Sequence, residues 1–432
     1  MKAFRILHFT AFVFALGLYE MAAYGRGSGD QDFLGNVNVY GNLFASGTVA
    51  TVPNPTGNVT VDTGRIQAVQ DRLTSGGTIV LGAGTYNVSG LNITRSFLNI
   101  VGQGRGITFL KTTSGDLMNV GVASTNLDQL TLSNLTLWSA TGGGDILVPQ
   151  MGSGFHLNLC TFYNITMTQD NDAKFIVHGG GEGWIECVWE RFILQHTLTG
   201  SVSPMLFTSS TVEAINQNTF RQGRCINSGL YFFDLRGASS VGSDNFFSRI
   251  NFEVCNGGCI RGRSVWHTTI VDCDVWDITT TTNHLFEFSQ NAGGANIQGL
   301  YIRNLTRHGG TLGGGFTDIF LHNATVTGAT IEGARTTGGS AFSIDLGPNT
   351  DVTLIEIPSA VTVTNRSITT VQIASVTQNI KIGLGVIQWG TGSPETVVTA
   401  PIGSMYLRTD GGAITTLYIK ESGAGNTGWV AK

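Results

Sequence analysis

Short apolar stretches alternate with glycine turns through residues 76–110, GGTIVLGAGTYNVSGLNITRSFLNIVGQGRGITFL. The pattern predicts short strands at Thr78–Leu81, Leu91–Ile93, Leu98–Val101 and Ile107–Leu110. These strands are too short and too closely spaced to form long hairpins, and glycine supplies the positive φ that tight corners need. A chain that repeatedly runs a few residues and then turns predicts a solenoid whose strands stack on those of the next coil.

One amphipathic helix is expected before this strand series. Ile66, Val69 and Leu73 recur at helical spacing within residues 62–73, and no helical run follows Leu73. Further strands are expected at Leu130–Leu132, Leu135–Trp138, Phe155–Leu159, Ile185–Val188, Leu230–Phe233, Arg249–Val254, Thr269–Val275, Leu300–Ile302 and Ile319–Leu321. They recur without a strict residue repeat, which is what variable loops between fixed strands would produce.

The order of these elements over Asp62–Leu110 resembles the pectate-lyase-like right-handed parallel β-helix family. In that family a capping helix precedes a strand pair like GGTIVLGAGTY and a coil like LNIVGQGRGITFL. The resemblance implies an all-β fold built on a right-handed parallel β-helix. The two ends of the chain add an expected short N-terminal attachment segment and a small C-terminal β domain. The resemblance leaves the function open, because this fold carries lyases, hydrolases and binding proteins.

Three parts are predicted along the chain: residues 1–55, 56–345 and 346–432. In the first, the segment 33–52 alternates apolar and polar positions around glycines and cannot bury its apolar face alone. It resembles the short β-repeats of phage tail proteins, which intertwine in trimers. The first part is therefore expected to be an attachment segment, the second the β-helix, and the third a trimerisation or receptor-contact region.

The extreme N-terminus supports two interpretations. Its basic start and short apolar run, MKAFRILHFTAFVFALGL, are typical of a secretory signal peptide. However, Glu20 follows immediately and the cleavage site is poor, which favours a structural anchor. The run is too short and interrupted for a transmembrane span.

The C-terminal segment, GSMYLRTDGGAITTLYIKESGAGNTGW, reads as a compact meander with Asp-Gly-Gly and Gly-Asn turns. It resembles a segment found at the ends of many phage tail-fibre and tailspike chains. This resemblance implies a homotrimer in the virion tail, with a host surface polysaccharide as its partner and with other phage tail proteins bound through its N-terminus.

Composition narrows the remaining function classes. The 432 residues include 59 Gly, and only 12% are charged, which suits a long β-stack. A formal net charge of −5 without a basic cluster argues against nucleic acid as a partner. Neither the scattered histidines nor the cysteines have metal-ligand spacing, so no metal or cofactor is expected.

The six cysteines suggest small hydrophobic side chains inside coils more than a disulfide framework. Under the second interpretation, Cys255 and Cys259 are the plausible bridge.

Candidate chemistry comes from acids that alternate with apolar residues. Glu253 precedes Asp272 and Asp274 by 19 and 21 residues and follows Asp234 by 19, which is a credible coil length. These four acids are therefore predicted to form one outward stripe and to be the catalytic candidates. Glycosidic cleavage needs a proton donor and a second carboxylate at such separations. Residues predicted to line the substrate cleft are Trp276, Arg261, Arg263 and Trp266. The alternative is an ordinary solvated acidic face.

A second group consists of Glu182, Glu186 and Glu190 with Trp184 and Trp189. It predicts either a groove that binds a glycan or ordinary surface acids beside a partly buried aromatic residue.

The calcium and arginine motifs of pectate lyases are not recognisable. We therefore expect a tailspike-like protein that recognises a host polysaccharide, with its enzymatic activity left open. The alternatives are a binding-only or structural tail protein and a secreted bacterial polysaccharide lyase or hydrolase.

Overall fold

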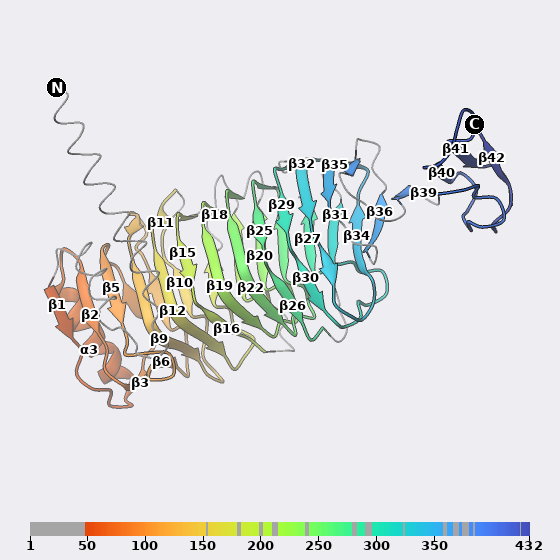
Figure 1. The fold of residues 1–432 in the computed structure, drawn as a ribbon. Coiled ribbons are helices and arrows are strands. Elements are labelled where there is room, and N and C mark those ends of the chain that lie inside the picture. The colour runs from red at the N-terminus through yellow and green to blue at the C-terminus, as the bar shows by residue number, and fades with distance from the viewer. Residues whose placement is uncertain are drawn as a thin grey trace, which may run out of the picture. The chain divides into compact units, whose positions relative to one another are not determined.

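The computed structural model shows a chain that coils repeatedly, with successive coils paired in parallel (Figure 1). It describes residues 48–152, 154–178, 183–197, 202–209, 215–237, 242–278, 283–289, 296–322, 325–356, 361–365, 371–373, 380–382, 385–423 and 425–432. The N-terminal segment 1–47, including the predicted anchor and most of the short β-repeats, lies outside these ranges.

Each coil contributes one strand to a 16-stranded sheet, called sheet I here. Its parallel strands are β4 (Leu91–Ile93), β7 (Met118–Val120), β10 (Leu147–Pro149), β13 (Ile176–His178), β17 (Met205–Ser209), β20 (Phe233–Gly237), β23 (Ile260–Arg263), β27 (Phe286–Ser289), β31 (Ile319–His322), β34 (Phe342–Leu346), β36 (Val361–Asn365) and β38 (Ile380–Ile382). This continuous parallel ladder confirms the predicted right-handed parallel β-helix.

The rest of each coil contributes to a 22-stranded sheet, sheet II, in which some coils supply one long strand and others supply two or more shorter ones. Its strands are β1 (Thr48–Thr51), β2 (Gly77–Val80), β3 (Gly84–Asn87), β5 (Leu98–Val101), β6 (Thr108–Thr112), β9 (Thr131–Ser139), β12 (Thr161–Gln169), β15 (Val188–Glu190), β16 (Ile193–Gln195), β19 (Thr219–Ile226), β21 (Gly242–Ser243), β22 (Phe246–Glu253), β24 (Val265–Trp266), β25 (Thr269–Val271), β26 (Asp274–Trp276), β28 (Ile297–Gln298), β29 (Tyr301–Arg303), β30 (Thr306–His308), β32 (Thr325–Glu332), β33 (Arg335–Thr336), β35 (Asn349–Ile355) and β37 (Val371–Ile373). A 4-stranded sheet completes the early coils, with β8 (Leu127–Asp128), β11 (His156–Asn158), β14 (Gly183–Ile185) and β18 (Ile215–Asn216).

Many corners of the coil are built by residues other than glycine with positive φ. One such corner divides sheet II into two strips and is occupied, coil after coil, by Asn134, Asn164, Arg191, Gln222, Arg249, Asp272 and Asn304. Left-handed backbone is uncommon for side chains other than Asn and Asp. Four of the seven positions carry Asn or Asp, which tolerate this conformation, whereas at Arg191, Gln222 and Arg249 the stacking of coils must hold the turn. We call this line the sheet II corner.

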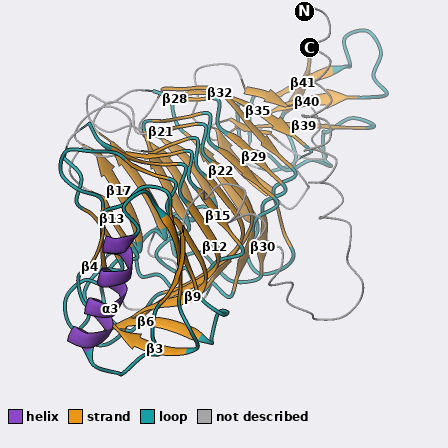
Figure 2. Ribbon diagram, turned by 90° about the vertical axis from the view of Figure 1, so that its left-hand side faces the viewer, coloured by secondary structure: helices purple, strands orange, loops and turns teal. Residues whose placement is uncertain are grey.

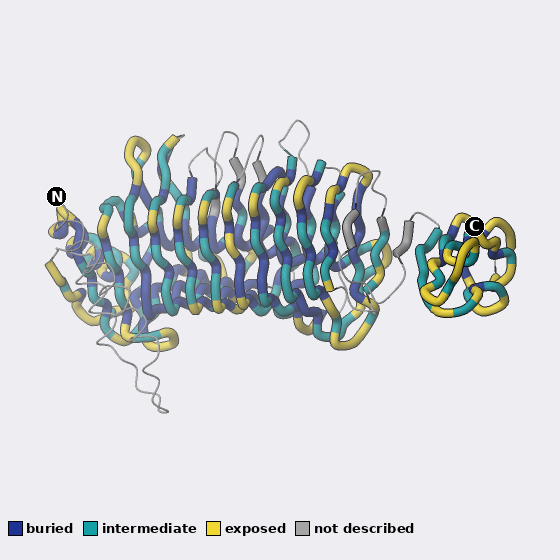
Figure 3. The backbone as a smooth tube through the Cα atoms, turned by 45° about the horizontal axis from the view of Figure 1, so that its top comes forward, coloured by how far each residue is buried: buried dark blue, intermediate teal, exposed yellow. Residues whose placement is uncertain are grey.

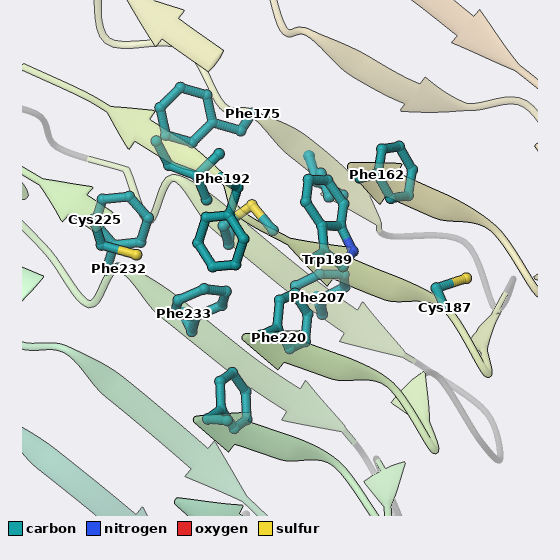
Figure 4. Packing of buried hydrophobic residues seen from close by; sticks show 14 of the residues in the cluster. Phe162, Phe175, Cys187, Trp189, Phe192, Phe207, Phe220, Cys225, Phe232 and Phe233 are labelled. Atoms are coloured by element: carbon teal, nitrogen blue, oxygen red, sulfur yellow. The ribbon is translucent and has the colours of Figure 1, made fainter. Parts of the chain in front are cut away.

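Aromatic side chains stack along the interior from coil to coil (Figure 4). Trp189 lies 3.8 Å from Phe162 by ring centroids, and Phe220 and Phe247 continue the column with a 4.9 Å separation. All four are almost completely buried. Figure 3 shows that buried segments recur from coil to coil along the solenoid.

A helix caps the first coils, as the apolar spacing predicts (Figure 2). It is α3 (Val59–Arg72), and it contacts β2, β3 and β4. Asn58 caps its N-terminus by accepting hydrogen bonds from the backbone N–H groups of Thr60 and Val61. Ile66 and Val69 are buried against the first coils.

Several strand boundaries differ from those predicted. The segment Ile185–Val188 does not form one strand: β14 ends at Ile185, and Glu186 turns with a φ of 54°. The segment Leu230–Phe233 mostly precedes β20, which begins at Phe233. In both cases an apolar run contains a corner, because buried residues also line the turns of a solenoid.

Parallel pairing continues past residue 345, since β36 pairs with β34 and β35 with β32. Further on, β40 (Met405–Arg408), β41 (Leu417–Lys420) and β42 (Trp429–Ala431) form the predicted antiparallel meander after β39 (Gly385–Gly390). Its small core holds Ala400, Tyr406, Tyr418 and Trp429.

The six cysteines are all buried and free. They serve as small apolar side chains of the coils, and the Cys255–Cys259 bridge is not formed.

Candidate functional site

The structure does not form the predicted single stripe of four acids. Asp234 lies on β20 of sheet I, whereas Glu253 and Asp274 lie on β22 and β26 of sheet II. The coil between β22 and β26 is longer than assumed, so the register places Trp276 beside Glu253 and Asn251 beside Asp274. The eight candidate residues therefore fall mainly into two groups on different faces.

The first group follows the outer side of sheet I, where Asp234 pairs in register with Arg261 and Arg261 with Glu287. Arg261 Nε donates to Asp234 Oδ1 at 2.8 Å, and Ser203 Oγ donates to Oδ2 at 3.1 Å. The Asp234 side chain is 0% exposed. Its carboxylate is thus neutralised and closed to solvent, an arrangement suited to holding adjacent coils together. Arg263 lies two residues along the same strand, beside Ser289.

Other polar groups surround this pair, and we call the set Tyr231, Asp234, Arg261, His284 and Glu287 the sheet I cluster. Tyr231 Oη donates to Glu287 Oε2 at 2.5 Å, and the Arg261 guanidinium lies 4.6 Å from the Tyr231 ring. Burial, reinforced by the Glu287 carboxylate, raises the pKa of Tyr231, so the hydroxyl stays protonated as a donor.

His284 is held in one tautomer. Its Nδ1 accepts a hydrogen bond from the Thr317 backbone N–H at 3.0 Å, so the proton of the neutral ring is on Nε2. The ring stacks on Phe320 with centroids 3.8 Å apart. Burial lowers the pKa of His284 below its usual 6.5, although Glu287 opposes the shift.

His284 is therefore expected to make the fold sensitive to acid. The unfolded chain takes up a proton on His284 more readily than the folded chain does. The part of the free energy of unfolding that depends on neutral His284 is therefore present above about pH 6.5 and is lost as the pH falls. The contribution is at most about 1.4 kcal/mol per pH unit. Urea unfolding at pH 7.5, 6.5 and 5.5 should show a smaller pH slope in His284→Asn, which retains an acceptor, than in the wild type. The same slope in both proteins would contradict this role, and His267→Asn, at an exposed position, is the control.

The second group lies on the outer face of the later strip of sheet II, and we call Arg224, Glu253, Asp274, Trp276 and His308 the Trp276 cluster. The Glu253 carboxylate accepts two hydrogen bonds from Arg224, at 2.8 and 2.6 Å. Trp276 is 39% exposed, and its ring stacks on His308 with centroids 3.6 Å apart. His308 Nε2 lies 3.0 Å from Asp274 Oδ1. Two predicted acids and the predicted tryptophan are thus brought together.

The remaining two candidates lie apart from both groups. Asp272 occupies the sheet II corner with a φ of 53°, and its Oδ1 accepts a hydrogen bond from Asn304 Nδ2 at 3.0 Å. Trp266 lies on β24 and donates from Nε1 to the Asn296 carbonyl at 2.8 Å.

The alternative glutamate and tryptophan group is mostly structural. Trp184 and Trp189 are core residues rather than groove residues. Glu190 pairs with Arg221 at 2.7 Å, and Glu186 forms a corner. Glu182 lies outside the described residues.

Sequence reasoning missed Arg224, His308, Tyr231, His284 and Glu287. Each lies in the coil before or after a candidate, at a distance set by loops of variable length. The alternation of Arg249–Val254 correctly indicated that Glu253 faces outward, but only the strand register shows that Trp276 and Arg224 are its neighbours.

Within the described ranges, no three His, Cys, Asp or Glu side chains converge to hold a metal ion. The helix that the structure describes is neither long nor apolar enough to cross a bilayer.

No protein-family model and no curated protein matches the sequence. Solved structures resemble it in fold. Polygalacturonase from Erwinia carotovora ssp. carotovora aligns with a TM-score of 0.49 at 10% identity, over 77% of this chain and 98% of that chain. The A-module of mannuronan C-5 epimerase AlgE6 from Azotobacter vinelandii aligns with a TM-score of 0.45 at 14% identity, over 78% and 99%. ORF18 of Geobacillus virus E2 aligns with a TM-score of 0.40 at 14% identity, over 72% of this chain and 65% of that chain. At such identities the likeness concerns the fold, and the parallel ladders of sheets I and II place the chain among the right-handed parallel β-helix proteins.

Proposed function

We propose that the chain recognises a polysaccharide through the Trp276 cluster. The supporting observation is the exposed indole of Trp276, which lies beside two outward-facing carboxyl groups and an imidazole on a flat sheet face. Sugars offer apolar C–H faces and many hydroxyls, so an aromatic ring with charged hydrogen-bonding groups around it suits them. The Asp234 carboxylate does not offer this, since it is closed to solvent.

The same cluster supplies the two carboxyl groups that glycosidic cleavage requires. Asp274 lies one coil from Glu253 and two residues along the strand. From the usual spacing between strands and the usual rise per residue, their β-carbons are about 8 Å apart. Side chains on β-carbons this far apart can bring their carboxyl groups to the separation of about 6.5–9.5 Å that suits an inverting hydrolase, in which one acid protonates the leaving oxygen and the other activates water.

Binding without cleavage is the second candidate function. Its support is that both carboxyl groups already have partners: Glu253 is held by Arg224, and Asp274 contacts His308. Carboxyl groups held by hydrogen-bonding partners in this way can orient sugar hydroxyls without transferring a proton.

The biological setting we propose is a homotrimeric spike of a phage tail, attached to other tail proteins through its N-terminal segment. One support is the similarity of the C-terminal meander to the ends of tail-fibre and tailspike chains. The other is that the core of this meander is small, and a small core gains stability from contacts with sister chains. Light scattering on the full chain tests this, and a stable monomer at micromolar concentration would contradict it.

If the Trp276 cluster recognises a polysaccharide, Trp276→Ala should weaken binding of the full chain to host-cell polysaccharide at least tenfold. The indole face and edge are lost while the coil keeps its interior residue Val275. Phe246→Ala is the matched control, because Phe246 is 36% exposed on the other strip of sheet II. Equal binding by the wild type and Trp276→Ala, measured by co-sedimentation with host cells, would refute this site.

Cleavage predicts that Asp274→Asn and Glu253→Gln each reduce oligosaccharide release by at least about a hundredfold, the lower range for general acid–base groups. Asp272→Asn should leave it unchanged. The readout is the amount of new reducing ends on the same polysaccharide. If the wild type binds but releases nothing, the binding-only function holds.

A further inference from the structure

Five arginines gather at the sheet II corner, beside the Trp276 cluster, and we call Arg105, Arg191, Arg221, Arg224 and Arg249 the arginine corner. Arg191 and Arg249 occupy the corner itself with φ angles of 56° and 51°, two coils apart. Arg221 and Arg224 lie on β19, in the coil between them. Arg105 reaches the corner from the loop between β5 and β6.

Acidic side chains balance only part of this charge. Glu190 pairs with Arg221 at 2.7 Å, and Glu253 pairs with Arg224 at 2.6 Å. Among the described residues, no carboxylate pairs with Arg105, Arg191 or Arg249. All three are exposed. The excess of positive charge is local, because the whole chain carries a formal net charge of −5.

The side chain of Arg105 is anchored on the backbone of Arg191. Arg105 Nη1 donates to the Arg191 carbonyl at 3.1 Å, across 86 residues of sequence. Arg191 in turn donates from Nη1 to Tyr163 Oη at 2.9 Å. Although Arg105 is exposed, partial desolvation of its guanidinium and then the nearby Arg191 charge lower its pKa. The two positive charges therefore repel each other, and an anion bound beside them would relieve this repulsion.

We propose that the arginine corner binds the acidic groups of an anionic polysaccharide. A guanidinium presents paired N–H donors that match a carboxylate, sulfate or phosphate group. Arg191 and Arg249 are separated by two coil spacings, or about 10 Å, so successive acidic groups of one chain can meet them. This inference rests on the proposed function, since Arg224 joins the corner to the Trp276 cluster and one glycan chain would contact both.

The test measures binding of the full chain to three polymers by isothermal titration calorimetry: polygalacturonate, dextran sulfate and neutral dextran. We expect polygalacturonate or dextran sulfate to bind, and the stronger of them identifies the acidic group. Arg191→Gln and Arg249→Gln should each weaken that binding about tenfold, and raising the salt concentration should weaken it further. Arg72→Gln is the matched control, because Arg72 is also exposed and, among the described residues, its side chain donates only to the backbone carbonyl of Ala68.

Each outcome decides a separate point. Equal affinity for dextran and the acidic polymers, or unchanged affinity in Arg191→Gln and Arg249→Gln, overturns the arginine corner while leaving polysaccharide recognition intact. Loss of host-polysaccharide binding in Trp276→Ala alongside these unchanged variants would separate the two sites. Tight binding of a duplex DNA with the same dependence on Arg191 and Arg249 would show a general polyanion surface and would also overturn the proposal. Absence of binding to every glycan, including the host polysaccharide, counts against the proposed function itself.

Discussion

Replacing Asp318 by asparagine should lower the free energy of unfolding by about 3–5 kcal/mol, because it leaves the buried Arg307 cation without its counter-ion. Arg307 stands in an interior column of the coil, beside Val275, and its side chain is 0% exposed. Its Nε donates to Asp318 Oδ1 at 2.6 Å, and its other nitrogens donate to backbone carbonyls that include those of Gly309 and Ser340. The Asp318→Asn chain should therefore unfold at a much lower urea concentration, followed by tryptophan fluorescence.

The double variant Arg307→Met, Asp318→Leu separates the missing charge partner from general damage. It removes both charges and fills the space with apolar groups, so it should recover part of the loss seen in Asp318→Asn. Arg335→Gln, at an exposed position in the next coil of sheet II, should change stability by less than about 0.5 kcal/mol. A similarly small change in Asp318→Asn would show that the buried pair does not stabilise the coil.

Trp189→Ala should cost about 3–5 kcal/mol, the range for a large aromatic side chain removed from a packed core. Trp189 is 0% exposed and lies between Phe162 and Phe220, with ring centroids 3.8 and 6.0 Å away. The cavity would open in the middle of the aromatic column, where neighbouring coils cannot collapse without losing their ladder hydrogen bonds. Thermal and urea unfolding of the full chain both measure the effect.

Trp189→Phe provides the contrast. The indole Nε1 is buried and has no hydrogen-bond partner among the described residues, so its removal relieves a cost. Phenylalanine also continues the column of Phe162, Phe220 and Phe247. We expect a loss of less than about 1.5 kcal/mol for this change. A loss as large as that of Trp189→Ala would mean that the indole itself is required.

Local pattern carried the prediction of the fold. The short strands between glycine turns at 76–110 required a chain that turns every few residues, and the spacing of Ile66 and Val69 required a helix before it. Both conclusions depend on residues close in sequence, where turn preference and periodicity act directly. For the same reason the meander after β39 was visible in its Asp-Gly-Gly turn.

The neighbours in adjacent coils were decided only in three dimensions. The alternation of apolar and polar residues correctly predicted that Glu253, Asp274 and Trp276 face outward. However, the length of each coil depends on its loops, and a change of two residues in that length gives a side chain a different neighbour in the next coil. Thus Glu253 meets Trp276 and Arg224, and Asp234 lies on another sheet with Arg261. Non-glycine corners such as Arg249, and an arginine facing inward at Arg307, have no local signature.

The sequence by itself determined that the chain forms a solenoid of short stacked strands preceded by an amphipathic helix, because those features follow from local periodicity and turn chemistry. The order of these elements, through its resemblance to pectate-lyase-like proteins, identified the solenoid as a parallel β-helix with a capping helix. The tertiary structure alone decided which charged and aromatic side chains share a face, because residues in contact across coils are far apart in sequence and their register is set by the cooperative stacking of strands.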